Sequence, residues 1–269
     1  MRFVSLNAWG GREWAALADW LPDVGADILC LQEVTRAPVP SPDWLTYAGP
    51  PRRIANRSDL FADVSRLLPD HQGQFAIAVR GTMDGPEGPL ASDHGTAFWV
   101  ARDLAVTAQA QSYAHGRFRH GGWGPEPVPR TLQLARVFAP ALGREILFGH
   151  VHGLRDPAGK MDTPDRARQA ETIVAALRAF RRPEEPVVFG GDFNVLPEGG
   201  LIVALAGEGL TELVTTRGHT DTRTSLYEKP VRYADYLMVS PEVRVEAFDA
   251  PAKPEVSDHR PLILDFALA

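Results

Sequence analysis

Several acidic, amide and imidazole side chains stand at the ends of apolar segments, where a hydrophobic core normally excludes them. Asn7 follows RFVSL, Glu33 follows ADILCLQ, and His152 ends the segment REILFGHVH. Asp192 and Asn194 come directly after PVVFGG. Taken singly, each has an ordinary explanation, because Asp and Asn often cap turns and a Glu at a strand end is mostly solvated. Carboxylates, amides and imidazoles are nevertheless the groups from which metal sites and acid–base sites are built.

Two later segments carry similar residues. Asp235 lies inside the apolar stretch YADYLMV, and Asp258 and His259 stand just before RPLILDF. Because burial of an unpaired carboxylate is strongly unfavourable, Asp235 needs a partner. The tripeptide SDH also occurs earlier in the chain, with Asp93 and His94. An Asp-His pair is common by chance, so the tripeptide itself does not show which copy performs chemistry.

Many short strands and a few helices must hold these side chains. Strands are predicted at 2–7, 26–33, 74–81, 95–101, 104–114, 129–139, 144–152, 186–192, 233–240, 242–248 and 260–266. Helices are predicted at 12–21, at 58–68 with Ser58 as N-cap, and at 162–180 with Thr163 as N-cap and Pro164 in the first turn. This order predicts an α/β fold in which two packed, mostly antiparallel sheets are flanked by helices.

Two connections, 81–94 and 115–129, are long for a compact domain, and such loops are often functional. A count of strand directions from residue 74, taken as one antiparallel meander, places both at the same edge as His152. His94 lies in the first connection. Arg117, Arg119 and Trp123 lie in the second, where arginines suit phosphate oxygens and Trp123 can stack on a base or shield a lipid. A solvated Asp93–His94 pair and a mobile hairpin tip remain the alternatives.

Composition limits the classes of function. The 269 residues fit a single domain spanning 1–269, and the net charge of −6 does not support, though it allows, nucleic acid as a partner. Cys30 is the sole cysteine, so no internal disulfide or multi-thiolate site can form. We predict no membrane span and no signal segment, and therefore a cytoplasmic location. Nothing in the sequence indicates an oligomeric state.

The motifs LNAW, LQEV, GHVHG, GGDFNVLP, YADYLMVS and SDHRPL, in this order, resemble those of the endonuclease/exonuclease/phosphatase superfamily of metal-dependent phosphoesterases. The resemblance implies a four-layered α/β sandwich and a divalent cation, usually Mg²⁺ with Mn²⁺ as a possible substitute, at one edge of the sheets. It implies Glu33 as the direct metal ligand, with Asn7 and Asp258 helping to hold the ion or its waters. Oxygen ligands of this kind suit a hard cation.

The resemblance also makes the second SDH the catalytic copy. It implies that Asp192 orients or deprotonates the attacking water and that Asn194 positions the phosphate. His259, held by Asp235, and His152 would contact the phosphoryl oxygens that gain charge. Phosphoester hydrolysis needs an activated water together with donors and positive charge around those oxygens, which fits this set.

The expected function is hydrolysis of a phosphodiester or a phosphomonoester, by a nuclease, a lipid or small-molecule phosphodiesterase, or a phosphatase. Trp9 and the segment RYADY depart from the motifs of AP endonucleases and inositol-polyphosphate 5-phosphatases. The histidine of GHVHG is more similar to the sphingomyelinase, deoxyribonuclease and broad phosphatase branches. A non-catalytic module that binds phosphate or nucleic acid on the same fold is the alternative. No G-x-S-x-G motif supports a serine hydrolase.

Overall fold

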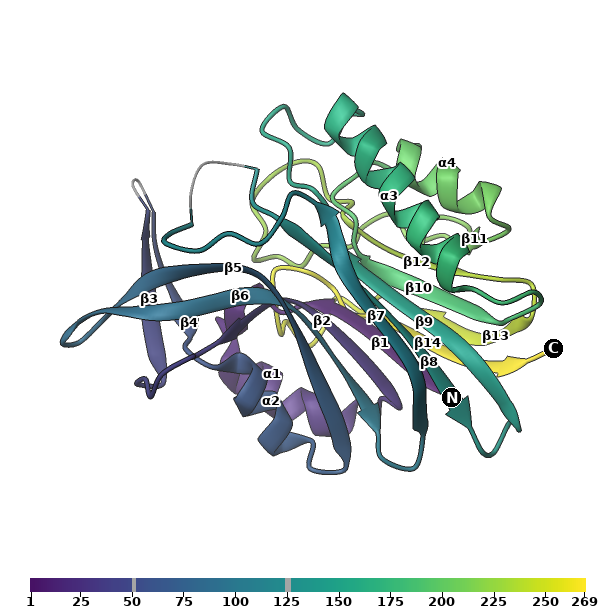
Figure 1. Ribbon diagram of the computed structural model, residues 1–269, viewed down its shortest axis with the longest axis horizontal. Helices are drawn as coiled ribbons and strands as arrows, with labels where there is room; N and C mark the ends of the chain where they lie inside the picture. Colours follow the sequence, from purple (N-terminus) through teal and green to yellow (C-terminus); the bar gives the residue numbers. More distant parts are fainter. Residues whose placement is uncertain (50–51, 124–126) are drawn as a thin grey trace.

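The computed structural model describes residues 1–49, 52–123 and 127–269, in which the predicted strands form two sheets packed face to face (Figure 1). The larger sheet has eight strands in the order β13-β14-β1-β2-β6-β5-β3-β4. Their bounds are β1 (Arg2–Asn7), β2 (Ile28–Arg36), β3 (Trp44–Gly49), β4 (Arg52–Arg57), β5 (His71–Gly85), β6 (Gly88–Ala101), β13 (Val243–Asp249) and β14 (Leu262–Leu268).

The second sheet has six strands in the order β11-β12-β10-β9-β8-β7. Their bounds are β7 (Ala105–His115), β8 (Arg130–Ala139), β9 (Arg144–His152), β10 (Val187–Asp192), β11 (Thr211–Glu212) and β12 (Asp235–Val239). Among the described strands, β1 with β2 and β9 with β10 pair in parallel, and the other neighbours are antiparallel. The predicted pair of mostly antiparallel sheets is therefore confirmed.

Helices cover the outer faces of both sheets. In Figure 1, α1 (Trp14–Asp23) and α2 (Leu60–Leu67) lie against the larger sheet, and α3 (Pro164–Phe180) and α4 (Gly200–Gly207) against the smaller one. A 3₁₀ turn, η1 (Trp9–Gly11), precedes α1. The layer order is thus helix, sheet, sheet, helix, as expected for a four-layered α/β sandwich. No helix of the described ranges has both the length and the apolar character needed to cross a bilayer.

The N-caps explain where two helices begin. Thr163 accepts a hydrogen bond from the backbone N–H of Arg166, and Pro164 occupies the first turn of α3, as predicted. The cap of α2 is Asp59 and not Ser58, because the Asp59 carboxylate accepts the N–H of Ala62.

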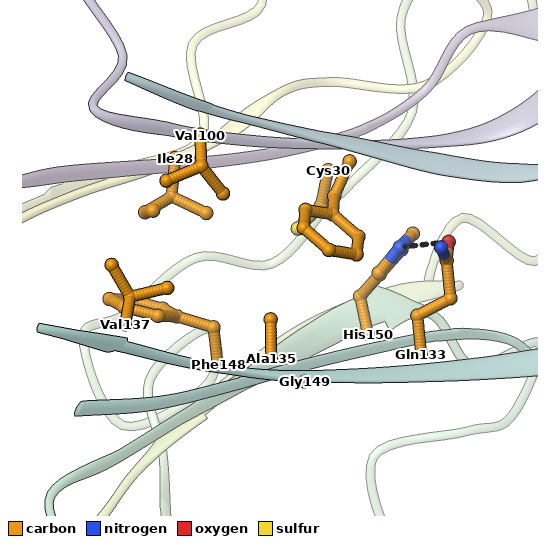
Figure 2. A pocket seen from close by; sticks show the side chains of 10 residues that line it. Ile28, Cys30, Val100, Gln133, Ala135, Val137, Phe148, Gly149 and His150 are labelled. Atoms are coloured by element: carbon orange, nitrogen blue, oxygen red, sulfur yellow. Dashed lines mark hydrogen bonds between the residues drawn. The ribbon is translucent and has the colours of Figure 1, made fainter. Parts of the chain in front are cut away.

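The core between the sheets is mainly apolar and closely packed, with a buried polar network of Gln32, Gln133 and His150. Phe3 of β1 stacks on Phe148 of β9, with ring centroids 5.8 Å apart. The cavity drawn in Figure 2 has a volume of only about 10 Å³, roughly the space that one water requires. Its walls include Cys30, which is buried as expected, and His150. A space of this size offers no room for a substrate.

Two expectations about the chain path are wrong. The predicted loop 81–94 belongs to a hairpin, because β5 and β6 continue as paired strands up to Gly85 and Gly88. The strands from residue 74 onward do not form one meander either. β6 belongs to the larger sheet and β7 to the smaller one, so the short turn 102–104 crosses between the sheets. The elements β3, β4 and α4 were not predicted.

Candidate active site

A bulge in β2 aims Glu33 at the site. β2 does not end at Glu33 but continues to Arg36, and its pairing with β6 shifts register between Leu31 and Val34. Glu33 adopts a φ of 54°, a left-handed conformation that is uncommon for residues other than glycine. Bulges of this kind redirect side chains beside active sites. The Glu33 carboxylate accepts a hydrogen bond of 3.2 Å from Asn7 Nδ2.

Asn7 links the two sheets. It ends β1 of the larger sheet, and its Nδ2 also donates to Asp192 Oδ2 at 3.0 Å, at the end of β10 in the smaller sheet. The Asn7 Oδ1 accepts the backbone N–H of Trp9, which fixes the orientation of the amide. Both Asn7 and Asp192 are buried. One amide therefore holds a carboxylate from each sheet.

Asp192 lies between two histidines. Its Oδ2 is 3.7 Å from the Nε2 of His152 and 3.7 Å from the Nε2 of His259. Its other oxygen accepts the backbone N–H of Asn194 at 3.0 Å, and Asn194 itself has a φ of 56°. Asn194 Nδ2 donates to the carbonyl of Gly153, which ties the turn after β10 to the end of β9. The turn GGDFN therefore presents Asp192 Oδ2 to both imidazoles.

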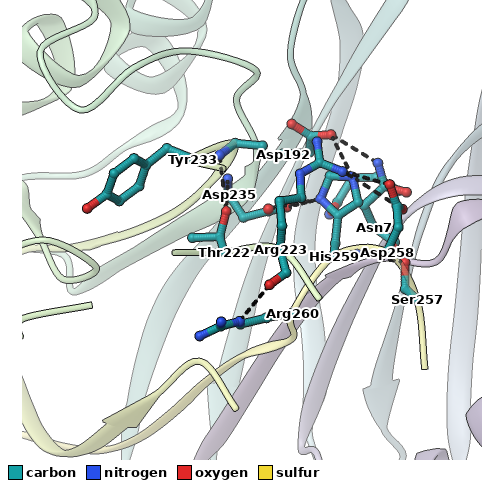
Figure 3. Close-up of polar contacts among 12 residues, drawn as sticks. Asn7, Asp192, Thr222, Arg223, Tyr233, Asp235, Ser257, Asp258, His259 and Arg260 are labelled. Carbon is teal, nitrogen blue, oxygen red and sulfur yellow. Dashed lines mark hydrogen bonds and ion pairs between the residues drawn. The ribbon is translucent and has the colours of Figure 1, made fainter. Parts of the chain in front are cut away.

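His259 is held by Asp235, which begins β12 (Figure 3). His259 Nδ1 lies 2.9 Å from both carboxylate oxygens, so the ring hydrogen is on Nδ1 and Nε2 faces Asp192. Burial raises the pKa of Asp235 to about 7, against the opposing effect of the nearby Arg223. Burial and then Arg223 lower the pKa of His259 to about 4. The partner required for the buried Asp235 is thus His259.

Asp258 is paired with a cation that was not predicted from the sequence. Arg223 Nη1 donates to Asp258 Oδ2 at 2.9 Å and also contacts His259 Nε2. Asp258 Oδ1 is buried without a hydrogen-bond partner in the described structure. Burial raises the pKa of Asp258, and His259 and Arg223 oppose this effect. Arg223 lies in a polar loop with no apolar periodicity, so no sequence signal marked it.

Two further cations were also missed. Nη1 of Arg130, the first residue of β8, lies 3.0 Å from each ring nitrogen of His152. Burial and then Arg130 hold the pKa of His152 well below its usual value. Lys160 donates to the carbonyl of Tyr233, and burial lowers its pKa to about 8, although Asp192 acts in the opposite direction. An arginine at the first position of a buried strand, directly after the long connection, was the available signal for Arg130.

The first SDH does not form a comparable unit. Asp93 is buried and pairs with Arg80 across the β5–β6 hairpin at 2.5 and 2.8 Å, so the alternative of a solvated Asp93–His94 pair is wrong. His94 lies beside Glu33 and Arg130 and is partly exposed. Burial lowers its pKa, and the Glu33 carboxylate opposes the shift. His94 is therefore at the rim of the site, beside the Glu33 carboxylate.

The second long connection packs on the hairpin beside His94. Trp123 Nε1 donates to the carbonyl of Thr82, and its ring meets those of His94 and Tyr47 edge-on. Arg119 donates to the carbonyls of Trp123 and Pro127, so its guanidinium holds its own loop together. Both connections thus lie on the Glu33 side of the molecule.

The remaining residues of this connection are less informative. Arg117 is exposed. Residues 124–126 lie outside the described part of the chain.

The carboxylates near Asn7 fit a hard divalent cation. Burial raises the pKa of Glu33, but His94, His259, Asn7 and Arg130 together bring it below its usual value, so the carboxylate is ionised. The unpartnered Asp258 Oδ1 is a second oxygen that needs a positive partner. Asp192, Asp235 and His259 also bring ligand atoms within 4.8 Å of one another. Asp235 and His259 already satisfy each other, however, so the oxygen set around Glu33 fits a cation better.

Two stacked sheets with carboxylates, amides and imidazoles gathered at one edge define an α/β sandwich with an edge site. The sequence model of the Endonuclease/Exonuclease/phosphatase family matches residues 4–259, so the chain belongs to this family. Family members are phosphoesterases, among them phosphatases and nucleases. A search of curated proteins found no match.

Solved structures share this fold. A mannosyl-6-phosphatase of Bacteroides thetaiotaomicron VPI-5482 aligns with a TM-score of 0.70 at 16% identity, over 99% of each chain. An endonuclease/exonuclease/phosphatase of Bacteroides vulgatus gives 0.68 at 19% identity, over 100% of this chain and 98% of the other. The human Nocturnin catalytic domain, with a bound sulfate anion, gives 0.65 at 17%, over 100% and 93%. These likenesses establish the fold.

Proposed function

We propose that the protein is a divalent-metal-dependent phosphoester hydrolase in which water attacks a phosphodiester or a phosphomonoester. The observation that carries this proposal is the position of Asp192 Oδ2, 3.0 Å from Asn7 Nδ2 and 3.7 Å from an imidazole nitrogen on either side. A carboxylate held in this way can orient a water or take its proton, while the imidazoles flank the reacting group.

Each residue has a defined part in this mechanism. Mg²⁺, or Mn²⁺ in its place, would be held by Glu33 with help from Asn7 and Asp258, and when bound would polarise the phosphoryl group. Asp192 receives the proton of the attacking water, because its outer lone pairs face the space between the two rings. Asn194 fixes one Asp192 oxygen through its backbone N–H. Its Nδ2 donates one hydrogen to the carbonyl of Gly153, and we propose that the second hydrogen positions the phosphate.

The two imidazoles face the phosphoryl oxygens from opposite sides. His259 Nε2 is fixed in direction because its Nδ1 is bound to Asp235. His152 Nε2 is oriented by Arg130, whose guanidinium nitrogen lies beside the ring. Because His259 Nε2 carries no hydrogen while Nδ1 donates to Asp235, the donors around the oxygens that gain charge are the guanidinium groups of Arg223 and Arg130 beside the two rings, and donors placed in advance stabilise the transition state without further reorganisation.

The rim contributes to the choice of substrate. His94 and Trp123 form a wall beside Glu33, and we propose that they contact the substrate group beyond the phosphate. Arg117, exposed on the same loop, can meet a charged extension of the substrate, whereas Arg119 supports the loop. The net charge of −6 argues against nucleic acid as the main partner. The single buried thiol of Cys30 is compatible with the proposed cytoplasmic location.

The test is a matched panel of substrates with Mg²⁺, Mn²⁺ or a chelator. The panel contains bis-p-nitrophenyl phosphate, p-nitrophenyl phosphate, plasmid DNA, short single strands and a phospholipid. We expect metal-dependent hydrolysis that Glu33→Gln abolishes. The control variant is Glu171→Gln, at an exposed position of α3, which should retain full activity. Silence across the panel would contradict hydrolysis of these ester classes and favour the binding-module alternative.

A further inference from the structure

Arg223 is a buried cation whose position is tightly fixed. Its side chain is 6% exposed, and its Nη1 donates to Asp258 Oδ2 at 2.9 Å and contacts His259 Nε2. The guanidinium carbon lies 4.1 Å from the ring centroid of Tyr227, so the planar group stacks on an aromatic face. Figure 3 shows it in the centre of the site, between Asp192, Asp258 and His259.

The backbone around Arg223 is hydrogen-bonded to the turn of residues 257–259, which carries Asp258 and His259. Arg223 and His259 form an antiparallel bridge, and the N–H of Thr224 donates to the carbonyl of Asp258 at 3.1 Å. On the other side, Thr222 Oγ1 accepts the backbone N–H of Asp235 at 3.3 Å. The segment 222–224 therefore connects both members of the Asp235–His259 pair. These backbone contacts therefore hold the Arg223 guanidinium at a fixed distance from the reacting position.

Arg223 has donor capacity that the protein does not use. Its Nε is buried and has no hydrogen-bond partner in the described structure. A guanidinium carries five donors in a planar fork that matches the oxygens of a phosphate group. A buried charged donor without a partner is unfavourable, so its persistence needs a reason. An oxyanion that reaches the edge formed by Nε and Nη2 supplies that partner.

We propose that Arg223 binds the phosphoryl oxygens of the substrate and that this substrate is a phosphomonoester. The assignment rests on the proposed hydrolase function. A monoester carries close to two negative charges near neutral pH, because its second ionisation lies near pH 6, whereas a diester carries one. Asp192 and Asp258 repel that extra charge. Arg223 beside His259 and Arg130 beside His152 offset the repulsion from the two sides of the site.

The experiment compares kcat/KM for p-nitrophenyl phosphate and bis-p-nitrophenyl phosphate. We expect the unmodified protein to prefer the monoester. Arg223→Gln should lower monoester turnover by about 100-fold or more, as loss of one transition-state donor does, and diester turnover by about 10-fold or less. Arg223→Lys should recover part of the monoester activity, since it restores the charge without the planar fork. Equal losses on both esters, or a wild-type preference for the diester, would overturn the proposal.

A matched control separates binding from positioning. Arg232 donates to the carbonyls of Arg223 and Thr224, but its Nε pairs with Asp221 outside the site. Arg232→Gln loosens the same backbone without removing the site cation. We expect it to lower turnover of both esters by similar factors. A monoester-selective loss in Arg232→Gln would show that Arg223 acts through the backbone and not through its guanidinium.

Direct binding of inorganic phosphate distinguishes this inference from the hydrolase function. Titration calorimetry with Mg²⁺ present should show binding that Arg223→Gln weakens by at least about 10-fold, with thermal unfolding as the check that the variant folds. This comparison holds even if neither nitrophenyl ester is hydrolysed. Phosphate binding that is equal in both proteins would overturn the role of Arg223, whatever the panel shows.

Discussion

The tripeptide Ser-Asp-His occurs twice, and the two copies have different surroundings. In the first copy, Asp93 and His94 lie inside the regular strand β6, where Asp93 pairs with Arg80 and His94 meets Trp123. In the second copy, residues 257–259 form the turn before β14, and Asp258 and His259 both belong to the site.

Backbone conformation accounts for this difference. Successive side chains of a strand point to opposite faces, so Asp93 and His94 cannot act on one group. In the turn 257–259, Ser257 Oγ donates to the carbonyl of Asn7 at 2.6 Å and accepts the N–H of His259 at 3.2 Å. Those bonds fold the chain so that neighbouring residues converge. The conformation of the chain around the tripeptide, and not the tripeptide itself, therefore determines whether its residues form a site.

The largest expected difference between the copies is catalytic. His259→Ala should reduce kcat by about 10³-fold, within the range for a lost acid–base or donor group, while the fold is retained. His94→Ala should have a weaker effect that depends on the substrate, because His94 lies at the rim. Steady-state kinetics on two esters measures both. Equal losses of kcat in the two variants would contradict the assignment of a catalytic role to the second copy alone.

Acid should destabilise the protein through its buried histidines. Burial lowers the pKa of His150 to about 3, so the neutral ring is favoured in the fold while the unfolded chain takes up a proton below about pH 6.5. Its contribution to stability is present above pH 6.5 and is lost, at about 1.4 kcal/mol per pH unit, as the pH falls toward 3.

Urea unfolding at pH 7.5 and 5.5 measures this contribution. The variant His150→Gln should lose about 1 kcal/mol less than the unmodified protein between these two values, by the same linkage. Asp235 acts in the opposite direction, since its raised pKa favours the fold as the pH falls below about 7, but it is unchanged in both proteins. Identical pH dependences would show that His150 is not held neutral by the fold.

The two serines provide a sharper comparison of stability. Ser257→Ala removes two hydrogen bonds and should lower the free energy of unfolding by about 1–3 kcal/mol. Ser92 is equally buried, but its Oγ has no hydrogen-bond partner among the described residues, so Ser92→Ala should be neutral or slightly stabilising. Denaturant unfolding of the two variants is the measurement. A larger loss in Ser92→Ala would contradict the contacts described for both sites.

The smallest effect is expected at Asp93. Asp93→Ala removes an ion pair with Arg80, whose side chain is 46% exposed, so the expected loss of stability is about 1 kcal/mol or less. Because the pair holds the hairpin beside Trp123, KM should change more than kcat. A fall in kcat comparable to that of His259→Ala would contradict this purely structural role of Asp93.

Elements with strong local signals could be predicted from the sequence. Helix α3 combines a Thr cap, a proline in the first turn and a long apolar stripe, and it begins where expected. Helix α4 is apolar over most of its length, so it has no stripe to recognise. The hairpin of β5 and β6 was taken for a loop because Gly and Pro interrupt its alternation, while tertiary pairing holds it together.

The site residues also divide into those that sequence motifs indicated and those that only contacts between distant segments position. Ordered motifs indicated Asn7, Asp192 and His259, and the structure brings them together. The bulge at Glu33 could not be foreseen, because it arises from pairing with a strand 60 residues away in sequence. Arg223 reaches the site through contacts with Asp258 and His259, which are distant in the chain. Their catalytic roles remain predictions.

The hydrogen bond from the Asn7 side-chain amide to Asp192 also makes the geometry of the site sensitive to movement of one sheet relative to the other. Residues of the site come from both sheets, so a slide of one sheet over the other by a fraction of an ångström would separate donors from acceptors. Such a slide requires no strand to break and exposes little apolar surface. On gentle heating, we therefore expect activity to fade while circular dichroism still reports intact sheets, and cooling should restore it.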